Sequence, residues 1–162
     1  ISIDNSPSFV RLGKAPEIDY TIPITKINID KPNIFKKGKD IIIFTSGNII
    51  KDVSEACTLL EKDEIFAEII IVNQLKPIDY LFFKKKIINK KVLVIEEHSD
   101  IGGLASILRD LIVNNNLKYL SFNKINLQDI PHKIIGSQNF QKKINQIDKK
   151  KIISKIKKIL KK

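Results

Sequence analysis

Residues 96 to 103 combine two glutamates, a histidine and a glycine pair directly after an apolar run, and these residue types could do chemistry. Histidine titrates near neutral pH, so a glutamate beside His98 could form a proton-transferring pair. Gly102 and Gly103 precede a helical pattern, and the N–H groups at a helix start attract anions such as phosphate. The same residues could instead make a tight turn between a strand and a helix.

The residues around this segment favour the structural interpretation. Successive side chains of a strand point to opposite sides, so Glu96 and Glu97 cannot easily act as a carboxylate pair. His98 is not accompanied by a nucleophile motif, and the Gly-x-Gly-x-x-Gly pattern of dinucleotide sites is absent. We therefore predict no catalytic residue here but an ordered corner or an interface, with an anion or regulatory site at His98, Gly102 and Gly103 as the alternative.

Four apolar runs predict the strands that position this segment, over residues 41–45, 67–73, 91–97 and 119–125. Helical patterns follow the first and third runs, and Asp79 is a suitable N-cap for a helix that ends near Ile87. Two more helical stretches follow Gly136. Strands without alternation are buried on both faces, and here they alternate with amphipathic helices. The sequence therefore predicts a three-layer α/β/α domain with a mostly parallel, roughly five-stranded sheet.

This domain is expected to span residues 39–162. Residues 13–38 hold three of the six prolines and no helical period, which is typical of an extended linker. Residues 1–12 resemble one last strand of a preceding domain. Because the chain opens with Ile1 and contains no methionine, we interpret it as a piece of a longer polypeptide.

The charge is concentrated near one end of the chain. Residues 141–162 contain ten lysines and one aspartate, and so account for +9 of the net charge of +11. Specific nucleic-acid surfaces use arginine for bidentate base contacts and aromatics for stacking, and this tail has neither. Its last helix has an aliphatic face without Trp or Phe anchors, so we expect it to pack on the sheet rather than on a membrane. Neither nucleic acid nor a membrane is therefore an expected partner.

The few sulfur and imidazole groups limit the chemistry further. Cys57 is the single cysteine, so no internal disulfide can form, and a reducing, cytoplasmic location is expected. Cys57 lies on an apolar helical stripe, which favours a core residue over a reactive thiol. With two histidines and one cysteine, a structural zinc site is not expected, and no metal ligands are assigned.

Four motifs follow one another between residues 41 and 160: Lys76-Pro77-Ile78-Asp79, Glu96-Glu97-His98, Gly102-Gly103-Leu104 and Gly136-Ser137-Gln138. In order and spacing they resemble the C-terminal domain of transketolase-type enzymes, which depend on thiamine diphosphate. Relatives often have Gly-Gly-Leu-Gly-Ser where this chain has Ala105 as the fourth residue. Alanine suits the first turn of a helix, so the expected fold is unchanged.

The resemblance implies a role for the chain as part of a larger enzyme. The full enzyme would be a homodimer that transfers two-carbon ketol units between sugar phosphates. Thiamine diphosphate and Mg²⁺ would be held by upstream domains or a separate subunit, and neither would bind to this fragment, which alone would be inactive. In the family this domain supports dimer assembly and has also been proposed as a regulatory site. The resemblance also implies that residues 1–12 are the last strand of the family's preceding, pyrimidine-binding domain. By motif position, Arg11 in this strand would contact the phosphate of the substrate.

Three alternatives to this assignment remain. The motifs containing Glu97 and Ser137 favour the transketolase C-terminal-section type within the family. The chain could instead come from 1-deoxyxylulose-5-phosphate synthase or from the beta subunit of a 2-oxo-acid dehydrogenase. Outside the family, a stand-alone module that binds an anion at Gly102 and Gly103 is the remaining alternative.

Overall fold

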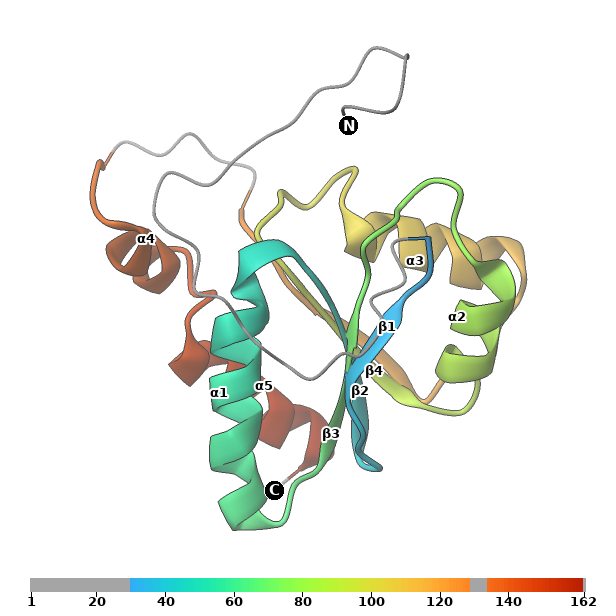
Figure 1. The fold of residues 1–162 in the computed structure, drawn as a ribbon, viewed down its shortest axis with the longest axis horizontal. Coiled ribbons are helices and arrows are strands. Elements are labelled where there is room, and N and C mark those ends of the chain that lie inside the picture. The colour runs from blue at the N-terminus through green and yellow to red at the C-terminus, as the bar shows by residue number, and fades with distance from the viewer. Residues whose placement is uncertain (1–29, 129–133, 162) are drawn as a thin grey trace.

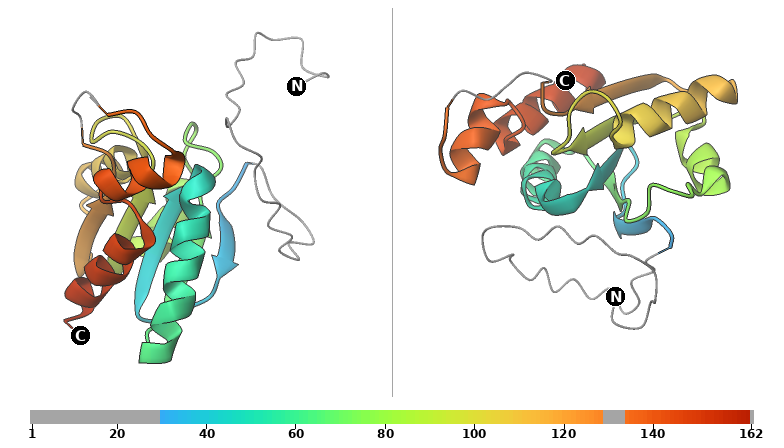
Figure 2. Two further views of the ribbon diagram at one scale, coloured as in Figure 1. Left: turned by 90° about the vertical axis from the view of Figure 1, so that its left-hand side faces the viewer. Right: turned by 90° about the horizontal axis from the view of Figure 1, so that it is seen from above.

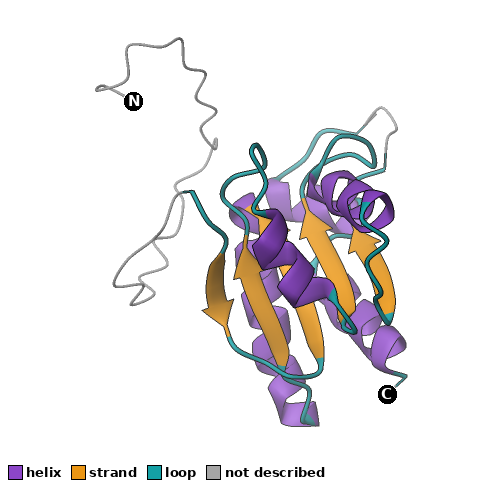
Figure 3. Ribbon diagram, turned by 90° about the vertical axis from the view of Figure 1, so that its right-hand side faces the viewer, coloured by secondary structure: helices purple, strands orange, loops and turns teal. Residues whose placement is uncertain are grey.

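The computed structural model describes residues 30–128 and 134–161, which form a five-stranded sheet covered by helices on both faces (Figure 1). The strand order is β1-β3-β2-β4-β5, and only β1 runs antiparallel to its neighbour. Figure 3 shows the short β1 at one edge of the sheet. The strands are Asn33–Lys36 (β1), Ile41–Ser46 (β2), Ala67–Ile71 (β3), Lys91–Glu96 (β4) and Ser121–Ile125 (β5). The predicted three-layer class and mostly parallel sheet are confirmed.

Side-chain alternation along the central strand β2 divides the core into two halves. Ile41 and Ile43 pack toward α1 and α5, whereas Ile42 and Phe44 pack toward α2 and α3. Both faces are apolar because both are covered, which explains the unbroken apolar run in the sequence. Figure 2 shows the helices on the two sides of the sheet. The helices are Ile50–Leu60 (α1), Tyr80–Ile87 (α2), Leu104–Asn114 (α3), Gln138–Ile144 (α4) and Lys149–Leu160 (α5).

The last helix packs as predicted, with its apolar stripe on the protein. Ile152 and Ile156 of α5 are fully buried in the core that α5 shares with α1. On the side toward α1, Lys149 lies 2.8 Å from Glu55 and Lys157 lies 2.8 Å from Asp63. No helix within residues 30–128 and 134–161 is long and apolar enough to cross a membrane.

Two local predictions can be compared directly with the structure. The carboxylate of Asp79 accepts a hydrogen bond of 3.0 Å from the N–H of Phe82, which confirms Asp79 as the N-cap of α2. Cys57 is buried in the core beside α5, as expected of an apolar position. Burial raises the pKa of the Cys57 thiol to about 12, which leaves almost no thiolate at neutral pH.

Strand β1 lies inside the segment that the sequence predicts to be an extended linker. An extended backbone was expected there, but its antiparallel pairing with β3 was not. The pairing is irregular, since the register shifts between Ile34 and Lys36. Residues 1–29 lie outside the described residues, so the strand expected in residues 1–12, and Arg11 with it, are not described. The domain boundaries at residues 12 and 38 stay a prediction.

Candidate functional site

The segment singled out in the sequence lies at the carboxyl ends of the parallel strands. It leaves β4 at Glu96 and enters α3 at Leu104. Open α/β sheets place their ligands at this end of the strands, so the position agrees with a functional site. Whether it can bind anything depends on what its polar groups already contact.

The carboxylate of Glu96 caps the start of α3. Its two oxygens accept hydrogen bonds from the N–H groups of Leu104, at 2.7 Å, and Ala105, at 2.9 Å. These donors have no partner within the helix, and the helix start carries partial positive charge. Glu96 is only 4% exposed, so its charge is compensated by these donors rather than by water. This contact was missed in the sequence, where Glu96 was considered only as a catalytic or paired carboxylate.

Gly103 provides the space that Glu96 occupies. A Cβ atom at position 103 would lie 2.3 Å from Oε2 of Glu96, far inside contact distance. Gly102 has a different role, since its backbone adopts a φ of 82°, which glycine accepts without strain. Its N–H donates to the hydroxyl of Ser106 at 3.2 Å. The two glycines therefore make the turn and the cap.

These contacts restrict the predicted anion site at His98, Gly102 and Gly103. A phosphate at the start of α3 would meet the carboxylate of Glu96, and the N–H groups of Leu104 and Ala105 are already bonded. His98 is exposed, and its Nδ1 lies 3.2 Å from the carbonyl oxygen of Ser99. The ring forms no ion pair with any residue of the described part of the chain. An anion site here stays a prediction, and it would need other donors.

Glu97 forms an ion pair with a lysine of α4. Its carboxylate lies 3.5 Å from Nζ of Lys142 on α4, and the same Nζ lies 2.7 Å from the carboxylate of Asp52 on α1. Lys142 is 7% exposed. Burial alone would lower the pKa of Lys142, but the hydrogen bond to Asp52 and the charge of Glu97 outweigh it and raise that pKa. This lysine therefore ties α4 to the sheet and to α1.

A third carboxylate anchors the loop to β5. Asp100 accepts hydrogen bonds from Lys124 and, at 2.6 Å, from the amide of Asn126. The hydrogen bond from Lys124, followed by that from Asn126, lowers the pKa of Asp100. The backbone carbonyl of His98 also accepts a hydrogen bond from the N–H of Leu127, at 2.9 Å. The loop is thus an ordered corner held from several sides.

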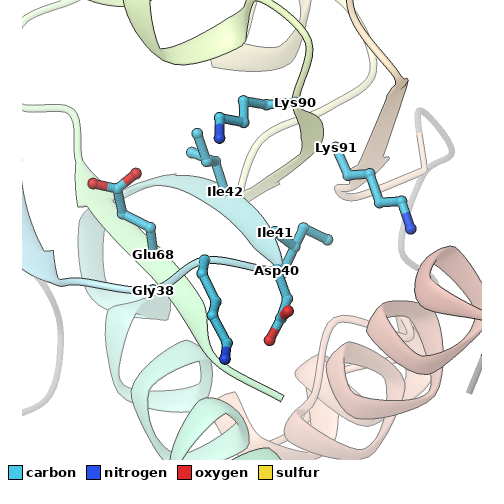
Figure 4. A pocket seen from close by; sticks show the side chains of 8 residues that line it. Gly38, Asp40, Ile41, Ile42, Glu68, Lys90 and Lys91 are labelled. Carbon is cyan, nitrogen blue, oxygen red and sulfur yellow. The ribbon is translucent and has the colours of Figure 1, made fainter.

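A small cavity lies at the opposite end of the sheet (Figure 4). Its volume is about 30 Å³, and Asp40, Glu68 and Lys91 are among its lining residues. Such a volume suits a single water molecule rather than a substrate.

The resemblance places thiamine diphosphate and Mg²⁺ in upstream domains or a separate subunit, and this location stays a prediction. At the start of α3 the carboxylate of Glu96 would repel a diphosphate. Within residues 30–128 and 134–161, no three His, Cys, Asp or Glu side chains are grouped so that they could hold a metal ion.

We predict that Gly103→Ala destabilises the fold through Glu96. Moving the carboxylate away from two N–H donors should cost about 1.5–3 kcal/mol per charge-assisted bond that is lost. Urea unfolding of Gly103→Ala, Glu96→Ala and the double variant measures the coupling between the two sites. If the clash with Glu96 is the cause, Gly103→Ala should cost clearly less in the Glu96→Ala background. Strictly additive effects would contradict this explanation.

The charge cluster around Lys142 leads to a second prediction. Lys142→Met should lower the free energy of unfolding by about 1–3 kcal/mol, because two carboxylates would stay close together without their cation. Lys143→Met is the matched control, since Lys143 is an exposed neighbour on the same helix. Thermal unfolding of both variants should show a loss for Lys142→Met alone. Equal melting temperatures would mean that Lys142 does not hold α4 in place.

Comparisons with known proteins agree with this fold. The family described as "Transketolase, C-terminal domain" matches residues 30–133. The 1-deoxy-D-xylulose-5-phosphate synthase of Halothermothrix orenii is 30% identical over 144 residues, which cover 87% of this chain and 22% of that protein. The putative transketolase C-terminal section of Methanocaldococcus jannaschii is 34% identical over 89 residues, which cover 55% of this chain and 28% of that protein.

A solved structure described as "Split gene transketolase, inactive beta4 tetramer" has a TM-score of 0.68 and 23% identity. It matches 86% of this chain and 44% of its own chain, and at this identity it bears on the fold alone. The chain thus spans less than half the length of each of these proteins. The family match covers more than half of the chain. The chain belongs to the transketolase C-terminal domain family.

Proposed function

We propose that the chain is the C-terminal domain of a thiamine diphosphate-dependent transferase of the transketolase type. The complete enzyme transfers a two-carbon ketol unit between sugar phosphates, and the cofactor supplies the carbanion chemistry when it is bound. The observation that carries this proposal is the match to the transketolase C-terminal domain over residues 30–133. Similarity to the transketolase C-terminal section of M. jannaschii supports the transketolase type.

Within that enzyme the domain contributes assembly rather than catalysis. The carboxylates of Glu96, Glu97 and Asp100, at the end of the sheet where ligands usually bind, all contact groups of the protein itself. Carboxylates that are bonded within the protein in this way favour a structural role for the corner over a catalytic one. Thiamine diphosphate and Mg²⁺ then belong to upstream domains or to a separate subunit, and the complete enzyme is a cytoplasmic homodimer.

Arg11 is the residue of this chain proposed to contact substrate. Its guanidinium has a planar fork of donors that suits two oxygens of a phosphate. Arg11 lies outside the described residues, so its proposed role depends on motif position alone. The chain contains one other arginine, Arg109, which is exposed on α3.

A second candidate is 1-deoxyxylulose-5-phosphate synthase. It is favoured by the similarity over 144 residues to the H. orenii enzyme, which covers 87% of this chain. The two candidates differ in product. The assembled enzyme should either transfer a ketol unit between sugar phosphates or form 1-deoxyxylulose 5-phosphate, and an assay of both products decides between them.

The proposal predicts that this chain does not bind the cofactor by itself. Isothermal titration of the 162-residue chain with thiamine diphosphate and Mg²⁺ should give no saturable heat. When the chain is produced together with the subunit or domains that carry the cofactor site, the assembly should bind the cofactor and transfer the ketol unit. Micromolar binding of thiamine diphosphate by the chain alone would contradict the proposal that the cofactor site lies in upstream domains or a separate subunit.

A further prediction concerns Arg11 in the assembled enzyme. Arg11→Ala should raise the KM for the sugar phosphate about tenfold or more, because the loss of a charged phosphate contact costs about 1.5–3 kcal/mol. Arg109→Ala is the matched control, since it removes the other arginine of the chain, which lies in α3. An unchanged KM for Arg11→Ala would contradict the proposed contact between Arg11 and the substrate phosphate.

A further inference from the structure

An open groove of about 420 Å³ lies beside the edge strand β5, between the end of that strand and α5. Lys124 and Asn126 reach it from β5 and the segment that follows. Gln146 reaches it from the turn between α4 and α5, and Lys151, Lys155 and Lys158 from α5. The groove is separate from the corner between β4 and α3, and none of the sequence motifs pointed to it.

The lining of this groove is strongly basic. Four of the lining residues are lysines, and the lining contains no aspartate or glutamate. Lys151, Lys155 and Lys158 follow one another at spacings of four and three residues, which places them on one face of α5. Lys124 approaches from a different element, β5, but it is paired with Asp100, so the unpaired positive charge of the groove comes from α5.

The lysines of the groove differ from the lysines on the α1 side of α5. Lys149 and Lys157 each pair with an acid at 2.8 Å. In contrast, Lys155 and Lys158 form no ion pair with any residue in 30–128 or 134–161. Lys151 donates only to a neutral group, the side-chain oxygen of Gln146, at 2.7 Å. The three lysines of α5 in the groove therefore have no acid as a partner among the described residues, whereas Lys124 is paired with Asp100.

Lysines beside an edge strand can also serve to prevent strands of other molecules from pairing with it. That role needs repulsion alone, whereas a bound ligand also needs directional donors. The groove supplies such donors. The amide groups of Asn126 and Gln146 line it together with the lysines, and the NH₂ group of Asn126 already donates one hydrogen bond to Asp100. The oxygen of Gln146 already accepts from Lys151, which leaves the NH₂ group of that amide to donate.

We propose that this groove binds a small organic anion that carries two or more phosphate groups. Ammonium groups bind phosphates as point charges, and several of them favour a ligand with several negative groups. The volume lies in the range of small-molecule sites, about 300–1,000 Å³. The lining holds neither an arginine nor an aromatic side chain, which disfavours nucleic acid, because base recognition and stacking use these residues. This binding does not depend on the function proposed for the whole enzyme.

The test is a titration of the ¹⁵N-labelled 162-residue chain with inorganic tripolyphosphate, followed by NMR. We expect saturable shifts confined to the backbone amides around the groove. The double variant Lys155→Gln/Lys158→Gln should weaken binding at least about tenfold, and added salt should weaken it in the wild type. Lys84→Gln/Lys85→Gln is the matched control, because both lysines are exposed on α2, on the other face of the sheet. The affinity of this control variant for tripolyphosphate should equal that of the wild type.

A second variant protects the test against a folding defect. Ser154→Glu places an acid at an exposed position of the groove and should weaken binding without removing a lysine. Tighter binding of ATP or of a sugar bisphosphate than of tripolyphosphate would support the proposal and identify the source of the phosphates. Shifts spread over lysines of other surfaces, equal affinities of the groove and control variants, or binding of duplex DNA but not of tripolyphosphate would overturn it.

Discussion

The contact between the carboxylate of Glu96 and the start of α3 is the constraint on which the corner after β4 depends. A buried carboxylate is costly unless its charge is compensated, and two helix N–H groups compensate it here. The contact fixes where α3 begins relative to β4, and it requires a residue without a side chain at Gly103. The six residues between Glu96 and Gly103 must therefore close a short loop of fixed span, which Gly102 permits with its positive φ.

The acids of this segment distribute their contacts over three different elements. Glu96 binds α3, Glu97 reaches Lys142 on α4, and Asp100 binds Lys124 on β5. Residues that look in sequence like a cluster of catalytic acids are thus separated by the alternation of the strand and by the loop. Their charge is used to join neighbouring elements at the end of the sheet where other α/β proteins place ligands.

Hydrophobic periodicity was sufficient to predict the layers, because continuous apolar strands and amphipathic helices have few other packing solutions. It was not sufficient for β1, where four residues in a proline-containing segment gain their structure from pairing with β3. The cap by Glu96 depends on a distance across the loop, which spacing alone does not give. Lys142 had no distinguishing signal in a tail with ten lysines, because its burial results from the position of Asp52 on α1, 90 residues away in the chain.

The structure also separates charges that the sequence presents as one basic tail. Lys142, Lys149 and Lys157 each meet an acid at 2.7 or 2.8 Å on α1 or on the turn that follows it. A general bias toward lysine would explain why the tail is basic, but it would not sort the lysines by their partners. Lys151, Lys155 and Lys158 line the groove beside β5 from α5, and none of them forms an ion pair with a described residue, whereas Lys124 on β5 is paired with Asp100. Net charge therefore says little about this domain until paired lysines are distinguished from unpaired ones, and three of the unpaired lysines lie together in this groove.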